Sequence, residues 1–387
     1  MFTQIFEITL MNLRNLPARL GSSSVIVVGI AGVVAVLVGM LSMAAGFTAA
    51  LEGTSQPGRA IVLRDGSNGE LSSGLTVEAF NILKGMEGIR IASDELYVVA
   101  DVPKRATGTP ANLVIRAMRR AGLEVRPEMS LIAGRLFEPG KGEVIVGVKA
   151  ASEFAGLEIG NVVEFRESAW TVVGQFTTEG SAYESEVWAD LAVTQANFRR
   201  GGFISSARVQ LEDPGLAAQI NERIQADPRL DLALKTEEEF YAGQAEDRAA
   251  LINTFGYSVA VIMAIGAVFA ALNTMYSAVS SRTVEIATLR ALGFSSVPVV
   301  VSVMIEAVFL ALLGGLVGGL GVYLLFDGYT ASTLNNASFS QVAFDFAVTP
   351  ALLTLGILWA LCLGLVGGLF PAVRAARLPI TVALRGE

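Results

Sequence analysis

The sequence lacks the side chains that most often carry hydrolytic or metal-dependent chemistry. Its 387 residues include no histidine, which removes the commonest general base and the commonest zinc ligand. A single cysteine, Cys362, excludes an intrachain disulfide. An enzyme in its own right is therefore the class that this composition favours least, and we expect no cofactor or metal on this chain.

Nucleotide-binding and hydrolase motifs are missing as well. The sequence contains no Gly-x-x-x-x-Gly-Lys-Ser/Thr loop for phosphates and no Gly-x-Ser-x-Gly turn for a nucleophilic serine. Nucleic acid is not an expected partner, because acidic side chains outnumber basic ones, 36 against 28. If ATP drives movement in this protein, we expect another chain to hydrolyse it.

Charges are nearly absent from four long stretches, 20–51, 249–281, 307–326 and 346–373. Each supplies the roughly 20 apolar residues that a helix needs to cross about 30 Å of hydrocarbon. The pattern predicts a membrane α-helical protein: four transmembrane helices in a one-plus-three layout, with a large α+β extracytoplasmic domain inserted between helices 1 and 2. A cleaved signal peptide is the alternative for the first stretch, but the apolar run is longer than a signal sequence needs.

Basic residues near the ends of these stretches predict the orientation. The segment 327–345 contains no basic residue, whereas both terminal flanks and the segment 282–296 do. Because Lys and Arg concentrate on the cytoplasmic side, we expect the inner (cytoplasmic) membrane, with both termini in the cytoplasm and the insertion outside. The basic residues on which this prediction depends are Arg14, Arg19, Arg282, Arg290, Arg374, Arg377 and Arg385.

These patterns divide the chain into successive segments. The first, 1–21, has apolar residues at roughly helical spacing and predicts an amphipathic helix on the cytoplasmic surface, with a loosely ordered leader as the alternative. The others are helix 1 with a stalk (22–51), the α+β domain (52–235), a stalk with helix 2 (236–281), a cytoplasmic loop (282–296), helix 3 (297–326), a short extracytoplasmic loop (327–349), helix 4 (350–373) and a cytoplasmic tail (374–387).

The inserted domain mixes two kinds of local pattern. Runs rich in β-branched and aromatic residues predict strands, and amphipathic runs predict the helices 77–86, 148–154 and 214–226. Glycines between the runs mark turns. The predicted strands are 61–63, 96–99, 113–115, 143–148, 162–165, 170–176, 186–191 and 207–211.

The return of the chain to the membrane carries a sharper signal. Thr236 followed three residues later by Glu239 is a capping box, which predicts that a helix begins here. No proline follows before Ser281, so one helix of about 65 Å is expected, twice the membrane thickness. We expect its outer part to be a stalk that transmits movement, with a plain spacer helix as the alternative.

Glycines and two polar residues stand out within the spans. The glycines have the small-xxx-small spacing that lets helix backbones approach, within the chain or between two copies of it: Gly314, Gly315, Gly318, Gly319, Gly364 and Gly368. Two polar side chains, Asn273 and Glu306, fall within the predicted membrane helices. For Glu306, pairing with a neighbouring helix or a basic loop residue and contact with a substrate are both open.

The cytoplasmic loop has the pattern of a short helix. Thr283 is placed to cap its start, Glu285 and Arg290 suit the two ends of its dipole, and Gly293 is placed to end it. Ile286, Leu289 and Leu292 form a small apolar face beside Phe294. As a pattern alone, this fits a helix that docks into a groove of a soluble partner and equally an elbow on the membrane surface.

This loop resembles the coupling loop of the MacB-type and FtsX-type ABC transporter permeases, the mechanotransmission (type VII) superfamily. In that family an Asn on helix 2 precedes Arg-x-x-Glu-Ile and a following Gly. The corresponding residues here are Asn273, Arg282, Glu285, Ile286 and Gly293. Similar motifs are 12–16, 305–307 and 371–384 in the membrane part, and 134–135, 143–147, 159–160 and 170–174 in the inserted domain, so the resemblance covers nearly the whole chain.

The resemblance implies a half-transporter that works as a dimer, in which a cytoplasmic ATPase moves the coupling helices and stalks relay that movement outward. It implies ATPase coupling for Arg282, Glu285, Ile286, Leu289, Arg290, Leu292, Gly293 and Phe294. MacB-type members carry the ATPase ahead of helix 1 on the same chain. Because this sequence begins just before helix 1, we expect a separate ATPase subunit that binds ATP and Mg.

The function implied by the resemblance is export of a hydrophobic or amphipathic substrate by a homodimer. In a Gram-negative cell, a periplasmic adaptor and an outer-membrane channel are further expected partners. Two alternatives remain, a lipoprotein-releasing permease and an FtsX-like scaffold that regulates a cell-wall hydrolase. An outer domain of roughly 200 residues favours the MacB-like alternative, because FtsX-type outer domains are smaller.

Overall fold

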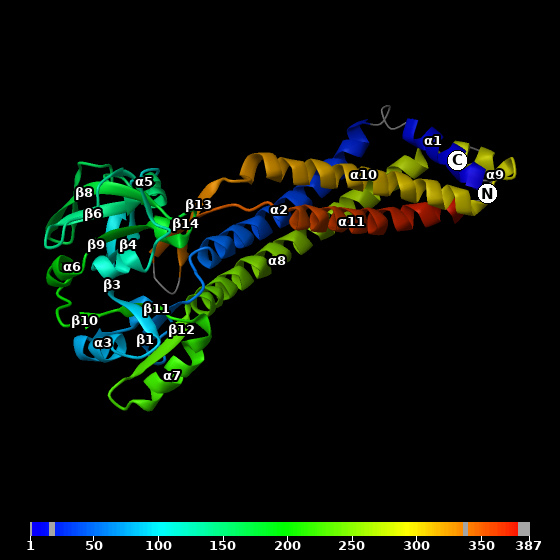
Figure 1. Cartoon of the computed structure of the whole chain (residues 1–387). Helices are drawn as coiled ribbons and strands as arrows, with labels where there is room; N and C mark the ends of the chain where they lie inside the picture. Colours follow the sequence, from blue (N-terminus) through cyan, green and yellow to red (C-terminus); the bar gives the residue numbers. More distant parts are fainter. Residues whose placement is uncertain (1, 15–19, 336–339, 378–387) are drawn as a thin grey trace. The chain divides into compact units, whose positions relative to one another are not determined.

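The structure, a computed structural model, describes residues 2–14, 20–335 and 340–377. Four helices in this part of the chain are long and apolar enough to cross a membrane. They are α2 (Leu20–Glu52), α8 (Glu237–Ser280), α10 (Ser296–Phe326) and α11 (Pro350–Arg377), with a strand-rich insertion between α2 and α8 (Figure 1). The predicted one-plus-three layout with an inserted α+β domain is confirmed.

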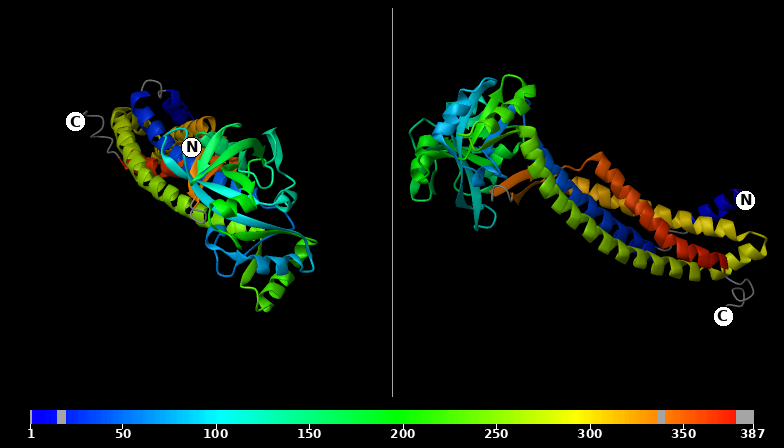
Figure 2. Two further views of the ribbon diagram at one scale, coloured as in Figure 1. Left: turned by 90° about the vertical axis from the view of Figure 1, so that its left-hand side faces the viewer. Right: turned by 90° about the horizontal axis from the view of Figure 1, so that it is seen from below.

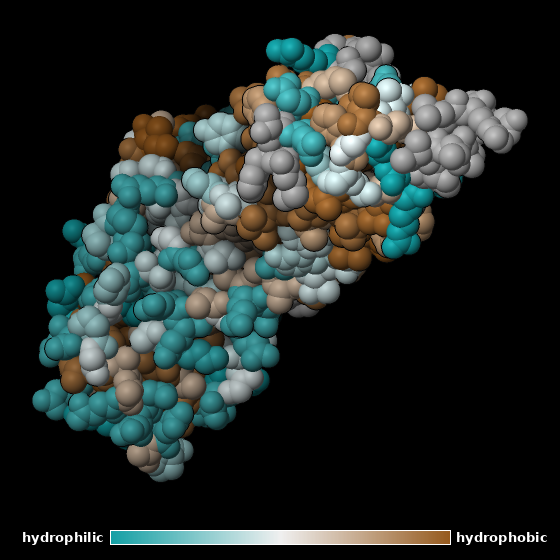
Figure 3. Space-filling view, turned by 90° about the vertical axis from the view of Figure 1, so that its right-hand side faces the viewer, coloured by the Kyte–Doolittle hydropathy of each residue, from teal (hydrophilic) through white to brown (hydrophobic). Residues whose placement is uncertain are grey.

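The chain forms two compact units. The membrane unit consists of residues 1–45, 250–329 and 346–387, and the α+β unit of residues 46–249 and 330–345. The boundary between them falls inside both α2 and α8. In Figure 3, apolar side chains gather over the membrane helices, whereas the α+β unit is mostly hydrophilic.

Close helix contacts build the membrane unit. Its long helices run side by side in Figure 2, and two short ones, α1 (Phe2–Arg14) and α9 (Thr283–Ala291), complete it. The six glycines singled out in the sequence all lie against another helix of the same chain. Gly314 and Gly318 face α2, Gly315 and Gly319 face α11, and Gly364 and Gly368 face α10.

The α+β unit is built on one large sheet. Within the described residues its strand order is β12-β1-β11-β3-β4-β9-β6-β8-β5, with β7 beside β8. The strands are β1 (Arg59–Arg64), β3 (Ile89–Pro103), β4 (Pro110–Met118), β5 (Ser130–Gly134), β6 (Glu143–Gly147), β7 (Val162–Phe165), β8 (Ser168–Thr177), β9 (Glu186–Asp190), β11 (Ser206–Leu211) and β12 (Leu232–Thr236), with a separate pair, β2 (Leu75–Thr76) and β10 (Phe203–Ile204).

Helices cover parts of this sheet and complete its core. Trp170, Trp188 and Phe154 are among the largest fully buried side chains, and they lie on or beside β6, β8 and β9. The three helices predicted for the domain are present, the last as η4 with α7. The helical segments are η2 (Glu70–Ser72), α3 (Val77–Lys84), α4 (Arg120–Glu124), α5 (Val148–Glu153), η3 (Ala182–Ser185), α6 (Leu191–Asn197), η4 (Pro214–Leu216) and α7 (Ala217–Ala226).

The segment 327–349, which we expected to be a short loop, contains a β-hairpin. Its strands are β13 (Thr330–Asn335) and β14 (Ser340–Asp345), and both belong to the α+β unit. The backbone N–H of Ala343 donates to Ser185 Oγ at 2.9 Å, and Phe344 is fully buried against Phe47. Because these partners lie far away in sequence, the local pattern contained no sign of the hairpin.

The capping box at the start of α8 is confirmed. The backbone N–H of Glu239 donates to Thr236 Oγ1 at 3.2 Å, and the N–H of Thr236 donates to Glu239 Oε2 at 3.1 Å. From there α8 continues without a break for 44 residues. One helix therefore contributes its first turns to the α+β unit and its remainder to the membrane unit.

A single methyl group tests the helix packing. At Gly318 it would collide with the backbone of Ala31 on α2, whereas at Gly321, on the same helix, it would meet no described atom within 4 Å. We expect Gly318→Ala to destabilise the chain by about 1–3 kcal/mol, the usual penalty of overpacking. Gly321→Ala should be neutral. Thermal unfolding of the two variants in the same detergent makes the comparison, and equal midpoints would contradict this packing.

Candidate functional site

The short helix predicted between residues 282 and 296 is present as α9. The prediction for its C-terminal end is correct, and the prediction for its N-terminal end is not. Gly293 has φ +96°, and the N–H groups of Gly293 and Phe294 donate to the carbonyls of Arg290 and Leu289, each at 3.1 Å. This is a Schellman motif, so the stop at Gly293 is confirmed. The capping role of Thr283 is wrong: the residue is already helical, and its hydroxyl donates to the carbonyl of Ser280 at 2.7 Å.

The two sides of α9 have different surroundings. Ile286 and Ala287 are buried in the membrane unit, whereas Val284 is 55% and Leu292 73% exposed. The three residues of the expected apolar face therefore differ in exposure: Ile286 is buried, Leu289 is half-buried and Leu292 is exposed. Apolar residues occur on both sides of this helix, so their spacing did not show which side faces the bundle.

Arg282, directly before α9, turns inward to Glu306 of α10. Its side chain is only 6% exposed, and its Nη1 donates to Glu306 Oε2 at 3.3 Å. Its Nε lies 3.5 Å from an oxygen of Glu285, whose side chain is 54% exposed. Of the two possibilities for Glu306, pairing with a basic loop residue is the one that the structure shows. Asn273 is exposed on α8, outside this cluster.

The ion pair borders a small cavity of about 20 Å³. Residues of α1, α8, α9 and α10 line it, and the Asn12 amide of α1 donates to Ser302 Oγ of α10 at 3.2 Å. This volume suffices for a water molecule and not for a larger ligand. The helix predicted near the N-terminus is thus present as α1 and is attached to α10 beside the pair.

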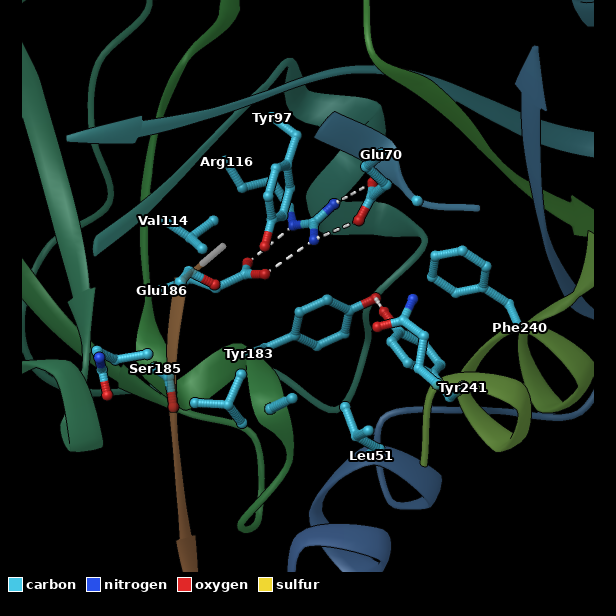
Figure 4. A pocket seen from close by; sticks show the side chains of 16 residues that line it. Leu51, Glu70, Tyr97, Val114, Arg116, Tyr183, Ser185, Glu186, Phe240 and Tyr241 are labelled. Carbon is cyan, nitrogen blue, oxygen red and sulfur yellow. Dashed lines mark hydrogen bonds and ion pairs between the residues drawn. The ribbon is translucent and has the colours of Figure 1, made fainter. Parts of the chain in front are cut away.

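A second cluster of charges lies buried in the α+β unit, centred on Arg116 of β4. Its guanidinium donates to both oxygens of Glu70 at 2.7 and 2.9 Å and to both oxygens of Glu186 at 2.8 Å, as Figure 4 shows. Glu95 of β3 accepts a further bond at 2.9 Å. The ring of Tyr97 lies 5.0 Å from the guanidinium carbon, within the range of a cation–π contact.

Further ion pairs extend this cluster to the first residue of α8. Arg208 donates to Glu237 at 2.5 Å, and Arg59 donates to the other oxygen of Glu237 at 2.7 Å. Arg208 also reaches Glu70 at 3.4 Å, which joins the two halves. We call the whole set the buried charge network: Arg59, Glu70, Glu95, Arg116, Arg126, Glu128, Glu186, Arg208 and Glu237.

The electrostatics favour the charged forms of Glu70 and Arg116. Burial disfavours the charged form of Glu70, but the attraction of Arg116 and Arg208 outweighs it and lowers the pKa of Glu70 to about 2. Burial likewise opposes the charge of Arg116, and Glu186 and Glu70 overcome it, so the pKa of Arg116 is raised. An acid and a base that stabilise each other's charge in this way suit a structural joint and do not suit general acid–base chemistry.

The cavity beside Arg116 is small. Its volume is about 40 Å³, whereas ligand sites occupy about 300–1,000 Å³. Its walls come from η2, η3, β4, the first turns of α8 and the hairpin strand β14. The cavity therefore marks the place where these elements meet, and the α+β unit offers no substrate pocket here.

Sequence reasoning missed this network entirely. Arg116 and Arg208 lie inside apolar strands, which was the only local signal that these charges are buried. Their carboxylate partners lie outside the local sequence, from 21 residues away for Arg116 and Glu95 to 138 residues away for Arg208 and Glu70. No short motif could have assembled such a set.

Comparison with known proteins agrees with this architecture. Residues 23–227, more than half of the chain, match the MacB-like periplasmic core domain, and residues 257–380 match the FtsX-like permease C-terminal model. The protein is therefore a membrane permease of the ABC transporter class. The chain belongs to the family of MacB-type and FtsX-like ABC transporter permeases.

Individual relatives are distant. The macrolide export ATP-binding/permease protein MacB of Brucella abortus (strain 2308) is 27% identical over 62% of this chain and 37% of its own length. The uncharacterized ABC transporter permease YknZ of Bacillus subtilis (strain 168) is 29% identical over 39% of this chain and 35% of its own. The crystal structure of the periplasmic region of MacB from Actinobacillus actinomycetemcomitans aligns with a TM-score of 0.37 at 12% identity. The alignment covers 47% of this chain and 89% of that one. The chain thus spans little more than a third of these two sequence relatives.

The buried charge network makes a direct prediction about stability. Arg116→Met leaves three buried carboxylates without their central cation, so we expect a loss of roughly 3–5 kcal/mol. Arg120→Met is the control, because Arg120 is 91% exposed and its pair with Glu124 contributes at most about 1 kcal/mol. Chemical unfolding of the full chain, followed by tryptophan fluorescence, measures both; Trp170 and Trp188 are buried in the α+β unit. Equal losses would show that the network does not stabilise the unit.

Proposed function

We propose that this chain is the permease subunit of an ABC transporter in which a separate cytoplasmic ATPase, binding ATP and Mg, drives movement of the α+β unit. The observation that carries the proposal is the continuity of α8. Its first residue, Glu237, is held in the buried charge network, and its last, Ser280, lies three positions before the coupling helix α9.

The mechanics of α8 favour a relay over a spacer. A helix of 44 residues measures roughly 66 Å, and its backbone hydrogen bonds resist stretching and bending. Glu237 has no exposed surface and pairs with Arg59 and Arg208 at its two oxygens. A displacement of α9 is therefore transmitted along α8 to the β-sheet without a flexible linker in between.

The outward side of α9 suits the ATPase contact. Val284, Thr288 and Leu292 follow one another at intervals of four residues, so they form one stripe, and all three are exposed. An apolar stripe on a short helix is typical of docking into a groove of a soluble partner. We propose that the ATPase contacts Val284 and Leu292, beside Glu285, and that Ile286, which is buried, anchors the helix in the bundle.

The substrate that we propose is hydrophobic or amphipathic. The relative from Brucella is named for macrolide export, and the small cavities beside Arg116 and Glu306 hold no substrate-sized site. We therefore propose extrusion by a homodimer, whose two α+β units move against a substrate taken from outside the cell membrane. In this proposal the chain lies in the inner (cytoplasmic) membrane, with both termini in the cytoplasm. In a Gram-negative cell, a periplasmic adaptor and an outer-membrane channel complete the export route.

A charge on the outward stripe of α9 tests the ATPase contact. We expect Leu292→Asp to reduce co-purification of the ATPase by about tenfold or more, the effect of charging an apolar contact. Ile159→Asp is the control, since Ile159 is 45% exposed but belongs to the α+β unit. Pull-down from mild detergent with quantitative mass spectrometry gives both ratios. Undiminished co-purification of Leu292→Asp would refute the docking surface.

A break in α8 tests the relay. Glu246 is exposed, so Glu246→Pro acts through the backbone, where proline removes a hydrogen bond and costs about 3 kcal/mol or more. We expect this variant to bind the ATPase but to lose the ATP-dependent movement of the α+β units. Glu246→Ala should keep it. The spin label is attached at Glu87→Cys, a position of the α+β unit whose native side chain is exposed. The readout is the distance between the labels of the two copies, with and without a non-hydrolysable ATP analogue. An unchanged response in Glu246→Pro would mean that α8 is only a spacer.

A further inference from the structure

We propose that Arg282 is a positioning residue that acts inside the chain: through Glu306 it fastens the coupling helix α9 to the transmembrane helix α10, and it does not contact the ATPase. This inference rests on the proposed function, because it concerns how movement leaves α9. It differs from the role that the family resemblance implied for Arg282, which grouped this residue with the ATPase contact.

Burial is the first argument. The Arg282 side chain, directly before α9, is 6% exposed and Glu306 is equally buried, whereas Leu292, directly after α9, is 73% exposed. A soluble partner reaches exposed atoms, so the outward stripe of α9 is available to the ATPase and Arg282 is not. Glu285 lies between these two environments, with its carboxylate 3.5 Å from the Arg282 guanidinium and half of its side chain exposed.

The position of Glu306 is the second argument. It lies ten residues after the start of α10, roughly 15 Å along the helix axis, within an apolar span. Arg282 therefore connects the beginning of α9 to a point well inside α10. A carboxylate at this depth is costly without a cation beside it. A movement of α9 that separated the two side chains would leave the Glu306 carboxylate without a cation, at a high cost in free energy. We therefore expect α10 to move together with α9.

The surroundings of the pair would allow Arg282 and Glu306 to stay bonded while α9 moves. A guanidinium has five N–H donors, and the Nη2 group of Arg282 is buried without a hydrogen-bond partner among the described residues. Spare donors let Arg282 keep a bond to Glu306 as the angle between the helices changes. One turn earlier on α10, Ser302 accepts the bond from Asn12, which attaches α1 beside the joint.

The experiment compares the full chain with its co-purified ATPase in four forms besides the wild type. These are Arg282→Met, Glu306→Gln, the charge exchange Arg282→Glu with Glu306→Arg, and the apolar pair Arg282→Met with Glu306→Leu. Each carries a spin label at position 87 in a Cys362→Ser background. Two quantities are measured: the amount of ATPase that co-purifies, and the change in label distance caused by a non-hydrolysable ATP analogue.

We expect all four forms to retain the ATPase, because none alters the outward stripe of α9. The single variants should reduce the ATP-dependent distance change by about fivefold or more, the range of allosteric couplings. The charge exchange should restore at least half of it. The apolar pair should fold, because apolar residues replace buried ion pairs well, yet the distance change should stay small, since apolar contacts let α9 slide over α10.

Several results would overturn the inference. Loss of the ATPase from Arg282→Met while Glu306→Gln retains it would mean that Arg282 contacts the partner. Full recovery in the apolar pair would mean that the ion pair only stabilises the fold. A folded charge exchange without recovery would also refute the joint. If Leu292→Asp keeps the ATPase, or if the wild type shows no distance change with ATP, the proposed function fails instead, so the two failures are distinguishable.

Discussion

A buried carboxylate at the first residue of α8 is the constraint on which the other features depend. Glu237 has no exposed surface, and an unpaired charge in such a place would be strongly destabilising. Arg59 and Arg208 satisfy its two oxygens from two neighbouring strands, β1 and β11. Because both cations are themselves buried, the helix cannot withdraw from the sheet without leaving charges unpaired on both sides. The start of α8 is therefore fixed to the sheet.

The chain holds two ion-pair joints that differ in character. The buried charge network is dense: Arg116 alone makes bonds of 2.7 to 2.9 Å to three carboxylates, and aromatic rings enclose it. The contacts of Arg282 are longer: its guanidinium lies 3.3 Å from Glu306 and 3.5 Å from Glu285. A network of short bonds shared among many residues resists deformation in every direction, whereas these longer contacts leave more room for rotation. One joint therefore suits an anchor, and the other suits a hinge between α9 and α10.

The sequence predicted the features that depend on neighbouring residues, and it missed those that depend on residues far apart along the chain. The strand runs, the capping box at Thr236 and Glu239, and the stop at Gly293 depend on neighbouring residues, so short patterns revealed them. The hairpin of β13 and β14 and the charge network depend on partners far along the chain. The face of α9 that is buried was equally hidden, because Ile286 and Leu292 are both apolar and only the fold distinguishes them.

The hairpin adds a third covalent route between the two units. Besides α2 and α8, the connection from α10 to α11 passes through β13 and β14. Strand β14 contacts Ser185 of η3, Lys149 of α5 and Phe47 of α2. The hairpin also follows α10 directly, which is the helix that Arg282 fastens to α9. In the proposed relay, α8 and the connection from α10 to α11 are therefore both continuous stretches of chain that lead from α9 to elements of the α+β unit.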